Sequence, residues 1–120
     1  MKIATVWFFA FILIAGGVNH IFNPKFYKYF IPEGWPKLLV NYVSGVVEIV
    51  LGVGVLFDAT MYWSATGILV LMIIFLPLHV IDLFRARPAI GSRALAIIRL
   101  PIQFLLIWGA WWLRSSSEFL

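Results

Sequence analysis

Cysteine is absent from this chain of 120 residues, and histidine occurs only twice. The absence of cysteine excludes disulfide bonds, thiolate metal sites and cysteine nucleophiles. Metal sites built from several histidine and carboxylate ligands are also hard to assemble from two histidines. The sequence contains neither a glycine-rich phosphate-binding motif nor the G-x-S-x-G motif of serine hydrolases. We therefore assign no catalytic residue and no metal ligand, and whether the protein is an enzyme stays open.

Charged residues are scarce as well. They make up 12% of the chain, whereas hydrophobic residues make up 63%. A typical soluble domain has about 25% charged and about 45–50% apolar residues. A soluble domain of this size could not bury so much apolar side chain, because small domains keep a large surface-to-volume ratio. The composition therefore predicts an integral protein of the cell membrane.

Four apolar stretches are long enough to cross a bilayer as helices, which takes about 20 residues each. Backbone groups in hydrocarbon must be hydrogen-bonded within their own segment, so these continuous runs predict helices rather than the alternating strands of a β-barrel. We expect an all-α fold, an integral membrane four-helix bundle with up-down-up-down topology. A short interfacial segment should join the first two helices, and the chain should form a single domain over residues 1–120. The expected helices span residues 3–20, 38–57, 61–84 and 94–113.

The first apolar run could also be a secretory signal peptide, because it follows a lysine at the N-terminus. However, it lacks the small-residue pattern of a cleavage site and continues into Asn19 and His20. We expect it to remain in the protein as the first helix.

The net charge of +4 could indicate nucleic-acid binding. In a membrane protein, however, basic residues flank the helices and contact lipid headgroups. We therefore expect membrane lipids and no nucleic acid as partners. Homo-oligomerisation stays open.

Residues 16–36 interrupt the apolar runs with polar groups, prolines and aromatic rings. Pro24, Pro32 and Pro36 should stop the first helix and shape a short cap at the membrane interface. In such interfacial segments lysines meet headgroups while apolar rings dip toward the acyl chains. The lysines are Lys25, Lys28 and Lys37, and the rings are those of Phe22, Phe26, Tyr27, Phe30 and Trp35. The segment should form a lid, with His20 beneath it.

Ionisable groups inside membrane segments are costly, and by default they mark function. With alternating topology, nearly all of these groups fall in the half of the bundle next to the lid, and Glu48 lies deepest. The opposite half is almost purely apolar. The candidate ligand-binding residues are Asn19, His20, Ser44, Glu48, His79, Asp82, Arg99 and Gln103.

Helical spacing places Asn41, Ser44 and Glu48 on one stripe of the second long helix. A buried Glu48 needs a partner, and Arg99 is the expected counter-ion because it keeps its proton and presents several donors. We expect the two side chains within salt-bridge or one-water distance. Polar groups of this kind can also simply hold helices together, and that alternative stays open.

Three motifs follow one another in the chain: GVNHIFNP at 17–24 followed by Phe26-Tyr27, SGVVE at 44–48, and RLPIQ at 99–103. In this order and spacing they resemble the signatures of DoxX-like small membrane proteins, over nearly the whole chain. The stretch Pro77-Leu78-His79 departs from the family pattern, so the resemblance implies no role for His79. The motif positions that it carries over are His20, Pro24, Glu48, Arg99 and Gln103.

The resemblance implies a four-helix membrane fold and association with a quinone-linked oxidoreductase system. One hypothesis is that a polar cavity binds the headgroup of a lipophilic molecule, such as a quinone or another isoprenoid. The protein would then be an accessory to a membrane oxidoreductase. The alternative is a non-catalytic membrane scaffold for a partner protein, and a weaker one is a transporter of protons or small solutes.

Two observations disagree about the orientation in the membrane. Cytoplasmic loops are enriched in Lys and Arg, and the lid side has more of them, which favours a cytoplasmic lid. The DoxX-like resemblance suggests the reverse, with cytoplasmic termini. The basic residues on the lid side are Lys25, Lys28, Lys37, Arg85, Arg87 and Arg93, against Lys2 and Arg114 on the other side.

Overall fold

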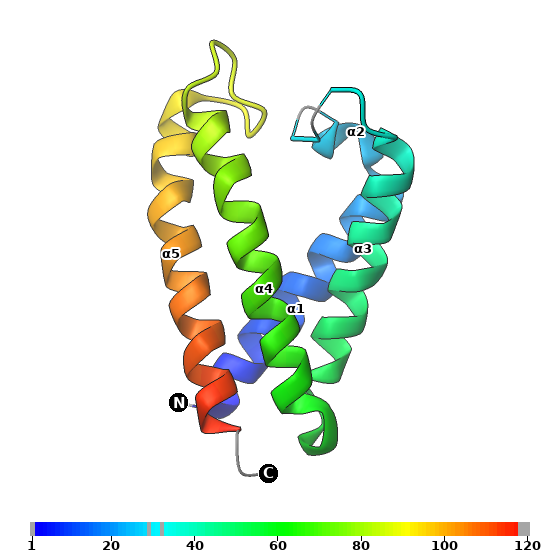
Figure 1. Cartoon of the computed structure of the whole chain (residues 1–120), viewed down its shortest axis with the longest axis vertical. Helices are drawn as coiled ribbons and strands as arrows, with labels where there is room; N and C mark the ends of the chain where they lie inside the picture. Colours follow the sequence, from blue (N-terminus) through cyan, green and yellow to red (C-terminus); the bar gives the residue numbers. More distant parts are fainter. Residues whose placement is uncertain (1, 29, 32, 118–120) are drawn as a thin grey trace.

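The computed structural model describes residues 2–28, 30–31 and 33–117, and it confirms the all-α bundle (Figure 1). Each of the four long helices is long and apolar enough to cross a membrane, so the chain is a multi-pass membrane protein. The second long helix ends at Gly54 rather than at residue 57, because a tight turn leads directly into the next helix. Pro32, predicted to help stop the first helix, lies outside the described residues. The elements are α1 (Lys2–Phe22), α2 (Pro24–Tyr27), α3 (Lys37–Gly54), α4 (Asp58–Leu83) and α5 (Arg93–Ser116).

Local sequence signals set several helix ends. Pro24 lies in the first turn of α2, where its missing N–H leaves no hydrogen bond unmade. Ser92 caps α5, because its hydroxyl oxygen accepts a hydrogen bond from the Leu95 backbone N–H at 3.2 Å. Gly91 just before it has a φ of +127°, a conformation that side chains disfavour. The loop between α4 and α5 therefore turns at a glycine and re-enters the membrane at a capped helix.

The four long helices form two pairs. α1 packs mainly against α3, and α4 packs mainly against α5. The pairs lie close together at the end that carries both chain termini, and they diverge toward the end that carries α2 and the α4–α5 loop (Figure 1). The bundle therefore has a closed end and a divergent end.

Glycines allow the close contact between α1 and α3. A Cβ added to Gly17 would lie 2.5 Å from the Gly45 carbonyl oxygen, and one added to Gly45 would lie 2.8 Å from the Cβ of His20. Gly52 similarly faces Ile14 of α1. Small residues such as Gly45 and Gly52 let helix backbones approach closely. The contact brings the His20 end of α1 directly against α3.

An apolar core fills the closed end. Phe9 and Leu13 of α1 pack there with Ile68 of α4 and Leu113 of α5. In the last turn of α5, Arg114 donates a hydrogen bond of 2.6 Å to the Tyr62 hydroxyl, which joins α5 to α4. Many large apolar side chains point outward from all four long helices, as expected for surfaces in contact with acyl chains.

Candidate functional site

A cavity of about 640 Å³ lies between the two helix pairs at the divergent end. It is covered by the lid, which comprises α2 and the described residues from there to Pro36, through Phe26, Tyr27, Phe30 and Trp35. Most of its walls are aliphatic or aromatic. The structure brings five of the eight predicted site residues together around it: His20, Ser44, Glu48, His79 and Arg99.

The buried imidazole of His20 joins α1 to α3 through both of its nitrogens. Its Nε2 lies 2.7 Å from Glu48 Oε2, and its Nδ1 lies 2.7 Å from Asn41 Oδ1. The Asn41 amide nitrogen donates a hydrogen bond of 2.5 Å to the His20 backbone carbonyl. A carbonyl can only accept, so this contact fixes the Asn41 amide with its oxygen toward the ring. His20 Nδ1 is therefore the donor, and its N–H points at Asn41.

The lid rests on this pair through Tyr27. The Tyr27 ring stacks on the His20 ring with centroids 3.5 Å apart and an interplanar angle of 12°. Its hydroxyl accepts a hydrogen bond of 2.9 Å from the Asn19 amide. Burial raises the pKa of the Tyr27 phenol, the nearby Glu48 carboxylate raises it further, and the Asn19 hydrogen bond opposes both. Tyr27 thus keeps its proton, and the lid presents a neutral ring to the site.

On the opposite wall, the lid contacts α4. The Phe30 ring meets the His79 ring edge to face, with centroids 5.7 Å apart. The lid therefore contacts a histidine of each helix pair, His20 on α1 and His79 on α4. A change in the separation of the two pairs has to move at least one of these ring contacts.

Arg99 of α5 lines the same cavity, but it forms no direct ion pair with Glu48 within the described residues. Of the two predicted geometries, the separation by one water stays a prediction. Glu48 contacts His20 instead, and Arg99 Nη1 is buried without a hydrogen-bond partner in the described part of the chain. The physical reason is the packing of the helices. Gly17 and Gly45 hold α1 tightly against α3, whereas α5 belongs to the pair that diverges from α3 at this end.

Three predicted site residues do not line the cavity. Asn19 supports Tyr27. Gln103 Nε2 donates a hydrogen bond of 2.6 Å to the Met72 carbonyl, which ties α5 to α4. The Asp82 carboxylate accepts hydrogen bonds from the backbone N–H groups of residues 89 and 90 and therefore anchors the α4–α5 loop. All three side chains hold the helices, the lid or the α4–α5 loop in place around the cavity.

A family model matches residues 9–114, which is most of the chain, and its description is a domain of unknown function, DUF8561. The chain belongs to this family. No curated protein and no solved structure matches the chain. The family description does not name DoxX, so the DoxX-like resemblance and the quinone link belong to the proposal below. What is established is a small multi-pass membrane protein of the DUF8561 family.

In this DUF8561 chain, no group of three or more histidine, aspartate or glutamate side chains converges among the described residues in a way that could hold a metal ion. The ionisable groups of the site instead fit a polar organic group, because donors and acceptors are spread over several walls. They come from α1, α3, α4 and α5. An occupant would therefore contact both helix pairs.

Two residues of the site were missing from the predicted set. Asn41 shares a helical stripe with Ser44 and Glu48, so the periodicity of α3 did contain a signal for it. Tyr27 was predicted to dip toward the acyl chains, but its ring lies on His20. No spacing rule predicts that contact, because it depends on where the lid folds back over α1.

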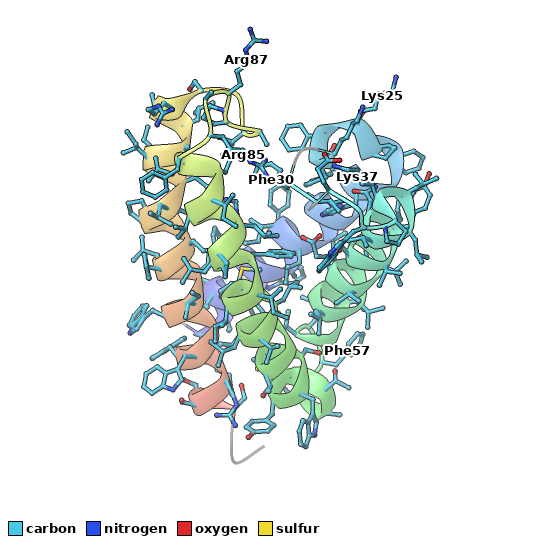
Figure 2. All side chains as sticks on the ribbon, turned by 45° about the horizontal axis from the view of Figure 1, so that its top comes forward. Lys25, Phe30, Lys37, Phe57, Arg85 and Arg87 are labelled. Atoms are coloured by element: carbon cyan, nitrogen blue, oxygen red, sulfur yellow. The ribbon has the colours of Figure 1, made fainter. Side chains whose placement is uncertain are left out.

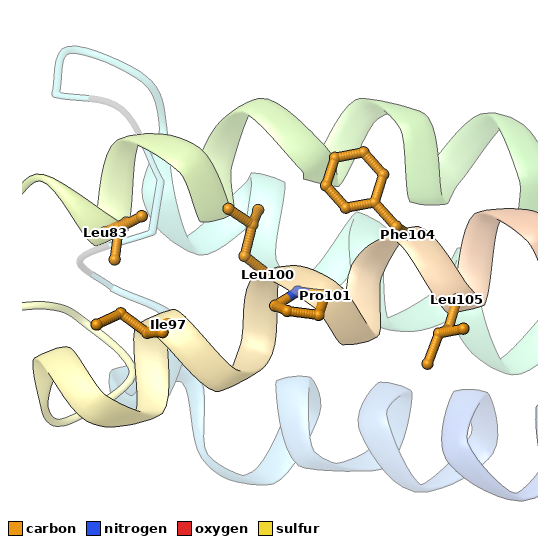
Figure 3. A pocket seen from close by; sticks show the side chains of 6 residues that line it. All are labelled: Leu83, Ile97, Leu100, Pro101, Phe104 and Leu105. Atoms are coloured by element: carbon orange, nitrogen blue, oxygen red, sulfur yellow. The ribbon is translucent and has the colours of Figure 1, made fainter.

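A second hollow of about 570 Å³ lies over the surface of α4 and α5 (Figure 3). Its lining residues are Leu83, Ile97, Leu100, Pro101, Phe104 and Leu105. All of these side chains are apolar, so the hollow offers no group for acid–base chemistry or for hydrogen bonding. It suits an acyl chain of the bilayer, and we assign no function to it.

Proposed function

We propose that this protein binds the polar headgroup of a lipophilic small molecule in the cavity at its divergent end. The observation that carries the proposal is the composition of that cavity. Its walls are largely apolar, yet it contains the His20–Glu48 pair and the unpartnered Nη1 of Arg99. Small-molecule sites commonly combine apolar walls with a few convergent polar groups.

The polar groups suggest how a headgroup would be held. Arg99 can donate hydrogen bonds to an oxygen of the ligand, since a guanidinium has donors only. The His20–Glu48 pair can form a hydrogen bond with a second oxygen of the ligand. The apolar walls from α1 and α4 would contact the apolar tail.

The DoxX-like resemblance suggests the class of ligand and the setting. It favours a quinone-type or other isoprenoid headgroup and an accessory role beside a membrane oxidoreductase. None of the side chains in the cavity is a redox group, so electron transfer would depend on a bound cofactor or a partner protein. The proposal therefore concerns binding and does not include a chemical step on this chain.

The alternative is a scaffold for a partner protein, in which the polar residues serve assembly. The contacts of Gln103 and Asp82 favour it, because both side chains bond to backbone groups of their own bundle. Under this alternative the cavity would hold only bulk lipid.

The test is to purify the protein in mild detergent, extract it and identify bound quinones and lipids by mass spectrometry. A specific lipophilic molecule at about one per chain would support the proposal. The variant Ser44→Leu, which fills part of the cavity, should lower that ratio. The matched control Val43→Leu changes an adjacent, outward-facing residue of α3 and should leave the ratio unchanged. Reproducible absence of any enriched molecule, or equal loss in both variants, would contradict the proposal and favour the scaffold.

A further inference from the structure

Arg99 differs from the acidic side chains at the divergent end in lacking an ion-pair partner. Three acidic groups lie at this end, and each has a basic side chain against it within the described residues: Glu33 with Lys37 at 3.1 Å, Asp82 with Arg85 at 3.6 Å, and Glu48 with His20 at 2.7 Å. Arg99 forms no ion pair within this part of the chain, and its Nη1 is buried without a hydrogen-bond partner.

Glu48 is not a direct counter-ion of Arg99, because its carboxylate lies against His20 of the neighbouring helix α1. Glu48 Oε2 is 2.7 Å from His20 Nε2, and no ion pair joins Glu48 to Arg99 within the described residues.

The remaining titratable groups that line the cavity do not supply a negative charge. Tyr27 keeps its phenolic proton, because burial raises its pKa. His79 can only be neutral or positive. Arg99 is permanently protonated, and it has no ion-pair partner among the described residues that line the cavity.

Arg99 is partly buried, and a charge that is removed from water without a counter-charge is unfavourable, so an occupant that brings a negative charge binds better than its neutral equivalent. Lys25, Lys37, Arg85 and Arg87 all lie at the end that carries the lid (Figure 2). Two of these cations pair with acidic groups there, Lys37 with Glu33 and Arg85 with Asp82.

We propose that the cavity selects an amphiphile whose headgroup carries a single negative charge on oxygen, a carboxylate or a phosphate diester, with Arg99 as its counter-ion. This inference rests on the proposed function and specifies the charge of the ligand. A neutral quinone carbonyl can accept a hydrogen bond from Arg99 but leaves its charge uncompensated. The preferred ligand is thus an acidic lipid or the anionic form of a lipophilic cofactor.

The test uses two probes with the same tail, hexadecyl methyl phosphate, which is a monoanion, and hexadecyl dimethyl phosphate, its neutral triester. Binding to the purified full-length protein in neutral detergent is measured by native mass spectrometry. We expect the anion to bind at least about tenfold more tightly, in line with a charge-assisted hydrogen bond. Arg99→Gln should remove most of this preference, whereas Arg99→Lys should keep it.

Arg87→Gln is the matched control, because Arg87 is an exposed cation at the same end and does not line the cavity. It should retain the preference, and thermal melting checks that every variant folds. Equal binding of the two probes by the unmodified protein, or an undiminished preference in Arg99→Gln, would overturn the charge inference while leaving the proposed function intact. Binding of neither probe, together with no enriched native lipid, would overturn both.

Discussion

His20 Nε2 on α1 lies 2.7 Å from Glu48 Oε2 on α3, and both side chains are buried within the bundle. The pair joins the two most tightly packed helices at the inner end of the cavity. It takes the place of a direct ion pair between Glu48 and Arg99, which was one of the two predicted geometries. The stability of the protein should therefore depend on His20 and Glu48 as a unit.

This unit can be tested by a double-mutant cycle. We expect His20→Leu to lower the free energy of unfolding by about 3–5 kcal/mol, because it leaves Glu48 buried without a cation. The double variant His20→Leu with Glu48→Leu should lose less than the sum of the single losses. Denaturant titration in detergent micelles measures each value. The cycle of Glu48→Gln with Arg99→Gln should be closer to additive. Strong coupling between Glu48 and Arg99, with no coupling between Glu48 and His20, would contradict the observed pairing.

The close contact between α1 and α3 predicts that a single methyl group added at Gly45 destabilises the protein. In Gly45→Ala the new Cβ would lie 2.8 Å from His20 Cβ and 2.9 Å from the Gly17 carbonyl oxygen. Both neighbours are fixed, so we expect a loss of about 1–3 kcal/mol in the free energy of unfolding. Gly67→Ala is the control, because its Cβ would meet only the end of the flexible Leu51 side chain. Equal losses in the two variants would argue against a specific α1–α3 contact.

The raised pKa of Tyr27 predicts that the protein loses stability at alkaline pH. Burial, with Glu48 adding to it, raises the pKa of its phenol above the ordinary value of 10.0. For a group with a raised folded-state pKa, the stabilising contribution is complete below the unfolded pKa and is lost as the pH rises through the folded pKa. The unmodified protein should therefore lose stability above pH 10.0 more steeply than Tyr27→Phe. An ultraviolet difference titration of the two proteins should show one phenol titrating above 10.0, and titration at or below that value would be evidence against a buried ring.

Orientation in the membrane can be decided with single cysteines, because the native chain has none. The excess of Lys and Arg beside the lid favours a cytoplasmic lid. We therefore expect Ser116→Cys to react with a membrane-impermeant maleimide in intact cells. Ala86→Cys, in the exposed α4–α5 loop at the opposite end, should react only after permeabilisation. The reverse pattern would place the cavity on the extracytoplasmic side, as the DoxX-like resemblance suggests.

The fold could be predicted from the sequence, because the length of an apolar run and the need to satisfy backbone hydrogen bonds leave few alternatives in a bilayer. The partner of Glu48 could not be predicted in the same way. Which cation reaches Glu48 depends on the rotation and separation of the helices, and those follow from the contact between Gly17 and Gly45. Asp82 shows a second difficulty. Its position in α4 suggested a place in the site, but its carboxylate accepts hydrogen bonds from backbone N–H groups of the α4–α5 loop instead.

The closed end of the bundle has a consequence for how the protein meets its lipids. Phe9, Leu13 and Ile68 fill that end with apolar side chains, so the cavity does not continue across the bundle as a polar path. Under the proposed function, a molecule bound beneath the lid would exchange with one leaflet of the bilayer, the leaflet on the side of the lid. The occupancy of the cavity should follow the composition of that leaflet and not that of the other. Moving a lipid from one leaflet to the other would therefore change its occupancy in the cavity without any change in its total amount.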